Sequence, residues 1–180
     1  MITWEDDWTK ADKAEAKIAI IEASDALAEL SGMLPQEAFH RLFGDITLEA
    51  CRTLPGRYHG YVMPGDAHRI KLRIGKVTDR LVIHELGHLI NDSLPVQDSP
   101  AHLLATQGIK TASGKWVTGF QGYAKRGYPW QQHPPNWKDG KLPTERWSDM
   151  FLAWATDNLQ DNEAGQAIRA FVEGYLRERG

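Results

Sequence analysis

Five consecutive residues, His84-Glu85-Leu86-Gly87-His88, contain the side chains that a catalytic zinc site requires. On a helix, the two histidines lie four residues apart on one face, so both imidazoles can reach a single ion. Glu85 lies one position further round, where its carboxylate can contact a metal-bound water but not the metal. The pattern therefore predicts water activation, in which the metal acidifies the water and Glu85 accepts its proton.

A catalytic zinc site takes a third protein ligand, and the two histidines leave that position open. The three-histidine pattern needs a histidine six residues after His88, and that position is Leu94. Asp92 continues the same helix and lies one turn too far along to close the site. We expect Glu145, on a second helix, to be the third ligand. Asp149, four residues later on the same face, would accept a hydrogen bond from a ligating imidazole.

Each of these residues also has a purely structural interpretation. Histidines on an apolar helix can be satisfied core residues, although burying two histidines and a glutamate without a purpose is costly. Glu145 suits a helix start for electrostatic reasons alone, and Asp149 would then be a surface residue. Gly87 indicates close approach of another backbone or helix, because a glycine in mid-helix costs about 1 kcal/mol relative to alanine.

The elements that must position these side chains are predicted from apolar periodicity. Helices are expected at residues 10–30, 35–43, 79–91, 144–158 and 163–179. Strands are expected at residues 46–52, 57–63 and 69–74, the last two joined by a turn. The helix at 79–91, capped by Thr78 or Asp79, is apolar on most sides, so it should be central and buried.

The strand at 69–74 alternates apolar and basic residues, which predicts a half-buried antiparallel sheet. Its apolar members are Ile70, Leu72 and Ile74, and its basic members are Arg69, Lys71 and Arg73. The basic face is most simply a solvated one. Helices, then sheet, then helices predict an α+β fold.

The length of 180 residues is enough for one domain with a substantial hydrophobic core and too short for two domains of typical size. Within a single domain at 1–180, residues 1–56 should be mainly helical, and residues 57–95 should hold the sheet and the histidine helix. Residues 96–143 form an irregular segment rich in Trp, Pro and Gly, which would be either a wall of the site or a gap-filling loop. Residues 144–180 should be C-terminal helices that carry the third ligand.

The composition argues against several functional classes. The net charge of -3 and the scattered basic residues provide no field that would attract nucleic acid. No stretch approaches the roughly 18 apolar residues of a membrane span, so no membrane partner is expected. The single Cys51 cannot form an internal disulfide and is most simply a small buried residue. The acidic N-terminus does not read as a signal peptide, and we expect a cytoplasmic protein; the oligomeric state is not indicated.

The histidine helix followed by a Glu-x-x-x-Asp helix resembles the gluzincin branch of zincin metallopeptidases. Residues 144–149 are similar to the Asn-Glu-x-x-Ser-Asp segment of thermolysin-like enzymes, and residues 145–151 to a helix of the anthrax lethal factor-like group. The resemblance covers roughly residues 69–157. It implies a zincin-like fold, with a small twisted antiparallel sheet packed on the active-site helix. It also implies that an edge strand within residues 57–74 aligns an extended peptide substrate.

In the lethal factor-like group, a tyrosine shortly before the ligand glutamate helps to stabilise the oxyanion. The resemblance implies this role for Tyr123, with Tyr128 as the alternative. The chain departs from the group here, because about twenty residues separate Tyr123 from Glu145.

The residues and the resemblance together predict a zinc metalloendopeptidase that hydrolyses peptide or protein substrates. His84, His88 and Glu145 would bind Zn²⁺, and Glu85 would be the general base. One alternative is a regulator-cleaving protease of the phage-repressor-associated type, which also carries HELGH and a downstream helical glutamate. Another is a non-catalytic binding module in which zinc only joins two helices, although such a site has no need of a base.

Overall fold

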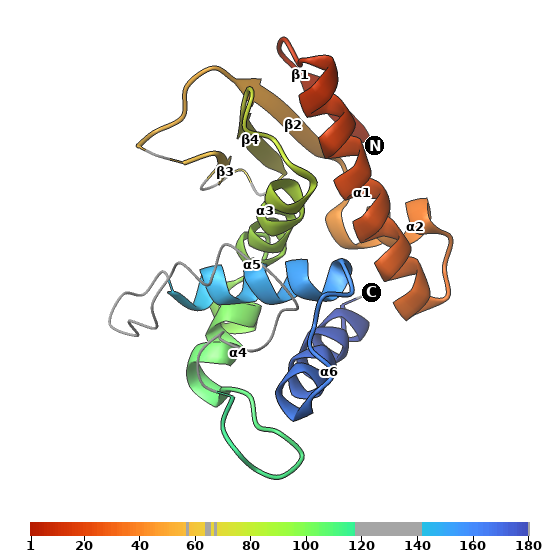
Figure 1. The fold of residues 1–180 in the computed structure, drawn as a ribbon, viewed down its shortest axis with the longest axis vertical. Helices are drawn as coiled ribbons and strands as arrows, with labels where there is room; N and C mark the ends of the chain where they lie inside the picture. Colours follow the sequence, from red (N-terminus) through yellow and green to blue (C-terminus); the bar gives the residue numbers. More distant parts are fainter. Residues whose placement is uncertain (57, 64–65, 67, 118–141, 180) are drawn as a thin grey trace.

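The computed structural model describes residues 1–56, 58–63, 66, 68–117 and 142–179 (Figure 1). This part of the chain forms a mixed α+β arrangement of helices and one four-stranded sheet. The strands are β1 (Ile2–Glu5), β2 (Ile46–Cys51), β3 (Gly60–Val62) and β4 (Arg69–Arg73). The helices are α1 (Lys10–Ser31), α2 (Pro35–Phe43), α3 (Asp79–Asp92), α4 (Pro100–Gln107), α5 (Leu142–Ala155) and α6 (Glu163–Arg177).

The sheet has the strand order β1-β2-β4-β3 and mixed pairing. β1 and β4 both run parallel to β2, and only β3 and β4 are antiparallel. The expectation of an antiparallel sheet is therefore wrong for two of the three strand pairs. For β1 and β2 the reason is that α1 and α2 form a helical crossover between them, which allows parallel pairing. For β2 and β4 the reason is that the chain reverses its direction at β3 and again before β4. Alternation of apolar and charged residues indicates that one face of the sheet is buried. It does not distinguish parallel from antiparallel pairing.

Two predicted segments contain elements that periodicity did not indicate. Residues 1–56 hold the strands β1 and β2 as well as two helices, and β1 was not predicted because it has only four residues. The segment at residues 96–143, predicted to be irregular, contains α4, which begins with common N-terminal capping residues. Ser99 accepts a hydrogen bond from the backbone N–H of His102, and Pro100 occupies the first turn.

The helix α3 lies at the centre of the molecule, between the sheet and α5 (Figure 1). The inner face of the sheet presents Ile46, Leu48, Ile70 and Leu72, which are at most 1% exposed. These side chains form a single core with apolar residues of the helices. The predicted central position of the histidine helix is thus confirmed.

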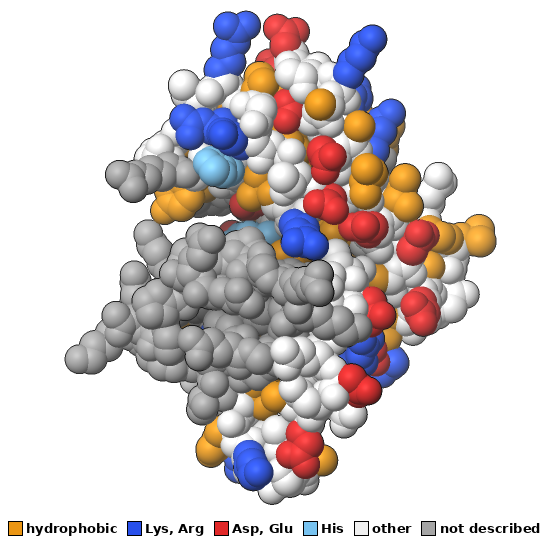
Figure 2. Space-filling model, in the orientation of Figure 1, with side chains coloured by type: hydrophobic (Ala, Val, Ile, Leu, Met, Phe, Trp, Pro, Cys, Tyr) orange, Lys and Arg blue, Asp and Glu red, His pale blue; other side chains and the backbone are white. Residues whose placement is uncertain are grey.

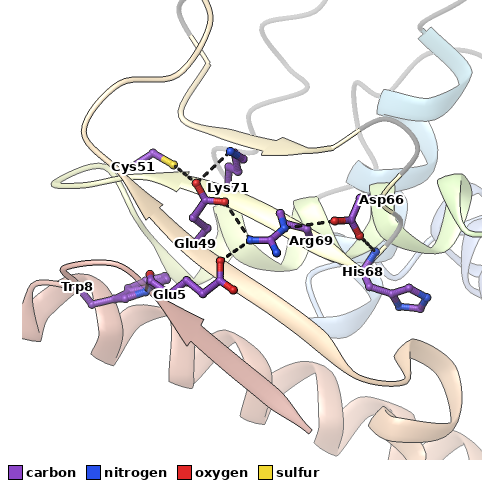
Figure 3. A network of polar contacts seen from close by, with 8 residues as sticks. All are labelled: Glu5, Trp8, Glu49, Cys51, Asp66, His68, Arg69 and Lys71. Atoms are coloured by element: carbon purple, nitrogen blue, oxygen red, sulfur yellow. Dashed lines mark hydrogen bonds and ion pairs between the residues drawn. The ribbon is translucent and has the colours of Figure 1, made fainter.

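The outer face of the sheet carries charged side chains that pair across the strands (Figure 3). Arg69 on β4 pairs with Glu5 on β1 and, at 3.2 Å, with Glu49 on β2. Lys71 also pairs with Glu49, at 3.0 Å. The thiol of Cys51 donates to Glu49, and burial together with this carboxylate raises the pKa of the thiol to about 11. The basic face of β4 is therefore stabilised by cross-strand ion pairs as well as by solvent.

The helix α1 was predicted at the correct place, but two of its three isoleucines lie outside its buried face. Ile18 and Ile21 are 45% and 58% exposed, whereas Ala16, Ala19 and Ala23 are fully buried. Small side chains allow α1 to approach the rest of the core closely. No described helix, α1 included, has the combination of length and apolarity that crossing a membrane requires. On the face drawn in Figure 2, basic side chains are scattered among acidic and uncharged ones.

Candidate metal centre

The sequence around the two histidines favours a helix that begins sharply and then becomes buried. The hydroxyl of Thr78 accepts a hydrogen bond from the backbone N–H of Leu81 at 3.1 Å, so Thr78 is the N-cap residue. Val82, Ile83 and Leu86 are fully buried. This packing holds α3 in one orientation and fixes the direction in which its polar side chains point.

The helix α5 crosses α3 at a glycine. A Cβ atom at Gly87 would lie 2.7 Å from the Cα of Ser148, a distance that real Cβ atoms essentially never show. The indole N–H of Trp147 donates to the carbonyl of Gly87 at 2.9 Å, and Trp147 is fully buried. The explanation of Gly87 as a point of close helix approach is confirmed. The crossing brings the first turn of α5 beside the histidines.

Three predicted ligands converge at this crossing: His84, His88 and Glu145. The two Nε2 atoms are 3.1 Å apart, and the carboxylate oxygens of Glu145 lie 3.3 Å from Nε2 of His84 and 3.4 Å from Nε2 of His88. A tetrahedral ion with bond lengths of about 2.0–2.2 Å separates its ligand atoms by about 3.3–3.6 Å. The three side chains could therefore hold one metal ion with little adjustment.

Asp149 contacts the nitrogen of His84 that faces away from the other ligands. Its Oδ1 atom lies 2.9 Å from Nδ1 of His84, and the aspartate is only 2% exposed. The two atoms are close enough for an ion pair, but their alignment is not that of a straight hydrogen bond. Asp149 is thus buried beside Nδ1, on the side of the ring opposite to Nε2, where it could orient the imidazole. Asp92 does not join the cluster.

The electrostatics of the cluster favour a positive charge at its centre. Burial alone would lower the pKa of His84, but the carboxylates of Asp149 and Glu145 raise it to about 10. Burial opposes ionisation of Glu145, yet the two imidazoles hold the pKa of its carboxyl well below the usual range. A proton or a metal cation on the imidazole nitrogens satisfies both carboxylates.

Glu85 is buried between α3 and the end strand of the sheet. It is 6% exposed, and burial raises the pKa of its carboxyl while the charges of His88 and His84 lower it. A Cβ atom at Gly60, on β3, would lie 2.5 Å from Oε1 of Glu85 and 2.7 Å from its Cγ. Gly60 was not predicted as a site residue. A glycine inside a strand pattern was the available signal, because it often marks close approach of another group.

The two candidate oxyanion donors, Tyr123 and Tyr128, lie outside the described residues, within 118–141. The same is true of most of the Trp- and Pro-rich part of the irregular segment. Their proposed roles therefore stay predictions.

Comparisons with protein-family models, with curated proteins and with solved structures give no match for this chain. The cluster of two histidines and one glutamate does not by itself identify a zincin, since the same ligand set can be built on different folds. Function is therefore argued below from the geometry and chemistry of the site.

Proposed function

We propose that the protein is a zinc-dependent peptidase. His84, His88 and Glu145 hold the metal, and Glu85 is the general base. The observation that carries the proposal is the convergence of His84, His88 and Glu145 on two helices that pack closely at Gly87. The two Nε2 atoms are 3.1 Å apart, and each lies 3.3–3.4 Å from a different carboxylate oxygen of Glu145. Two imidazoles and one carboxylate are a ligand set of catalytic zinc sites that leaves one coordination position open.

The side chains divide the chemistry of peptide hydrolysis between them. When bound, zinc supplies an electrophile for the substrate carbonyl and acidifies a water molecule. The carboxylate of Glu85 accepts the proton that the water loses as its oxygen bonds to the carbonyl carbon, and delivers that proton to the nitrogen as the C–N bond breaks. Asp149 would keep the ring of His84 oriented, with Nδ1 toward Asp149 and Nε2 toward Glu145.

The position of β3 supports a peptide substrate and a zincin-like arrangement. β3 is the last strand in the sheet order, and Gly60 on this strand contacts the side chain of Glu85. An extended peptide that pairs with the outer edge of β3 would therefore pass beside the general base. The burial of Glu85 also favours a catalytic site over a purely structural one, because a buried carboxylate is costly and a structural metal needs no base.

The substitution Glu85→Gln tests this proposal. It removes the proton acceptor and retains the metal ligands, so zinc content should stay at one ion per chain. Hydrolysis of an unstructured peptide library should fall by about 10²–10⁴-fold. Metal analysis and product detection by mass spectrometry measure the two effects.

Three results would contradict the proposal in different ways. A parent protein that remains metal-free after zinc loading and dialysis has no zinc site. A parent that binds zinc and cleaves no peptide is a non-catalytic zinc protein. If Glu85→Gln cleaves at the parent's rate, Glu85 is not the base.

A further inference from the structure

A cavity of about 520 Å³ lies beside the metal centre, between the end of α3, the helix α4 and the start of α5. Asp92 lines it from α3, four residues after His88 and hence on the same face, one turn of about 5–6 Å further on. Thr144 lines it from α5 and directly precedes Glu145. The cavity thus adjoins the metal centre along both helices that carry the ligands.

The carboxylate of Asp92 is held in place at this cavity. Its Oδ1 atom accepts a hydrogen bond from the amide of Asn91 at 2.9 Å. Asn91 is buried and is itself anchored, because its Oδ1 accepts from the backbone N–H of Ala101 at 3.2 Å. Among the described residues, no Lys or Arg forms an ion pair with Asp92.

The rest of the cavity wall combines aliphatic residues with the polar residues Asn91, Ser99 and Thr144. Leu94, Ala101, Ala105 and Pro143 contribute to it, together with the imidazole of His102. A wall of aliphatic and polar residues with one oriented carboxylate complements a side chain that has an apolar stem and a cationic end, as Lys and Arg do. An acidic side chain would be repelled, and an apolar one would leave the charge of the carboxylate without a counter-charge.

We infer that this cavity binds the side chain of a Lys or Arg residue of the peptide substrate, within two residues of the scissile bond. Asp92 is the residue that selects the positive charge. The inference rests on the proposed peptidase function. The distance fits, since residues of an extended peptide are about 3.3 Å apart and the cavity begins one helical turn from the ligands.

Matched peptides test the inference with the full chain loaded with zinc. A library first locates the position at which Lys or Arg is enriched. Two peptides that differ only by Lys or Gln at that position are then compared by kcat/KM at one fixed pH. The parent should prefer Lys by about 10–100-fold, the range expected for a charged hydrogen bond. The preference should be lost in Asp92→Asn and should change toward Glu in Asp92→Lys.

The control variant is Asp98→Asn, which makes the same chemical change at an exposed aspartate outside the cavity. It should keep the parent's preference for Lys, and the zinc content of Asp92→Asn should equal that of the parent. Cleavage without a Lys or Arg preference overturns the inference and leaves the peptidase function intact, as does an unchanged preference in Asp92→Asn. Loss of zinc in Asp92→Asn also overturns it, because Asp92 would then act through the metal. If the zinc-loaded protein cleaves no peptide at all, the proposed peptidase function itself is contradicted.

Discussion

Glu145 and Asp149 show how two carboxylates on one helix face can have separate roles. They lie four residues apart on α5, and both contact His84, but at opposite nitrogens of its ring. Glu145 faces the metal cluster and is 37% exposed in the described structure, whereas Asp149 is 2% exposed. One is placed to bind the metal directly and the other to orient a ligand.

Substitution of these residues should therefore have graded effects on zinc affinity. Glu145→Ala removes a metal bond and should abolish tight binding. Asp149→Ala removes only support for the imidazole and should weaken binding by about 10–100-fold. Asp92→Ala should change zinc affinity little, because Asp92 lies outside the cluster. Competition with a chelator ranks the three variants, and the assignment is falsified if Glu145→Ala binds zinc as tightly as the parent.

Gly60 positions Glu85 by leaving room for it. The missing Cβ would overlap Oε1, Cγ and Cδ of the Glu85 side chain, all within 2.8 Å. Because α3 is fixed by core packing, the carboxylate and not the helix would have to move.

We predict that Gly60→Ala keeps its zinc and loses activity. A displacement of a catalytic group by about 1 Å can cost about 10²-fold in rate, and none of the metal ligands is altered. Steady-state kinetics should show the loss in kcat, and metal analysis should show one zinc per chain. Turnover equal to that of the parent would mean that Glu85 does not depend on this contact.

The crossing of α3 and α5 is the contact between elements on which the site depends. It brings backbone against backbone at Gly87 and Ser148, and the Trp147 indole completes it with a hydrogen bond to α3. A helix with any side chain at position 87 would have to move away from α5, and the imidazoles would move with it.

Two glycine substitutions separate this packing effect from helix propensity. Gly174 lies inside α6, and a Cβ there would meet nothing within 4 Å. Gly174→Ala should therefore stabilise the protein by about 0.5–1 kcal/mol, because alanine is the better helix former. Gly87→Ala should destabilise it by about 1–3 kcal/mol through overpacking, despite the same gain in propensity. Urea denaturation measures both values, and equal stabilisation by the two substitutions would show that the crossing is not tight.

Considered as a whole, the molecule places its proposed ligands on two helices that are far apart in the sequence. A bound ion would join the centre of α3 to the start of α5 and so would link metal binding to the stability of the fold. The stability of the whole chain therefore reports whether the site has bound a metal ion.

Removal of the metal should lower the melting temperature. With free zinc at about 100 times its dissociation constant, the bound ion contributes about 2.7 kcal/mol, which for a chain of this size corresponds to about 5–10 °C in Tm. Thermal denaturation with and without a chelator measures this shift. Glu145→Ala is the control and should show no zinc-dependent shift. A parent whose Tm is the same in both conditions would contradict the proposed coupling.

Local patterns were enough to predict the residues of the His-His-Glu cluster and most of the helices. His84, Glu85 and His88 fall within little more than one helical turn, so their relative placement follows from helix geometry alone. The relative placement of Glu145 and Asp149 follows from helix geometry in the same way. The burial of Ile70 and Leu72 follows from the alternation of side chains along a strand.

Contacts between distant segments could be decided only by packing of the whole chain. The alternation in β4 is compatible with parallel or antiparallel neighbours, and β4 is parallel to β2 because the chain reverses its direction at β3 and again before β4. The contact of Gly60 with Glu85 has no counterpart in local spacing, since 25 positions separate the two residues in the sequence. Which helices cross, and at which residue, depends on how buried surfaces fit together, and that information is distributed over the entire core.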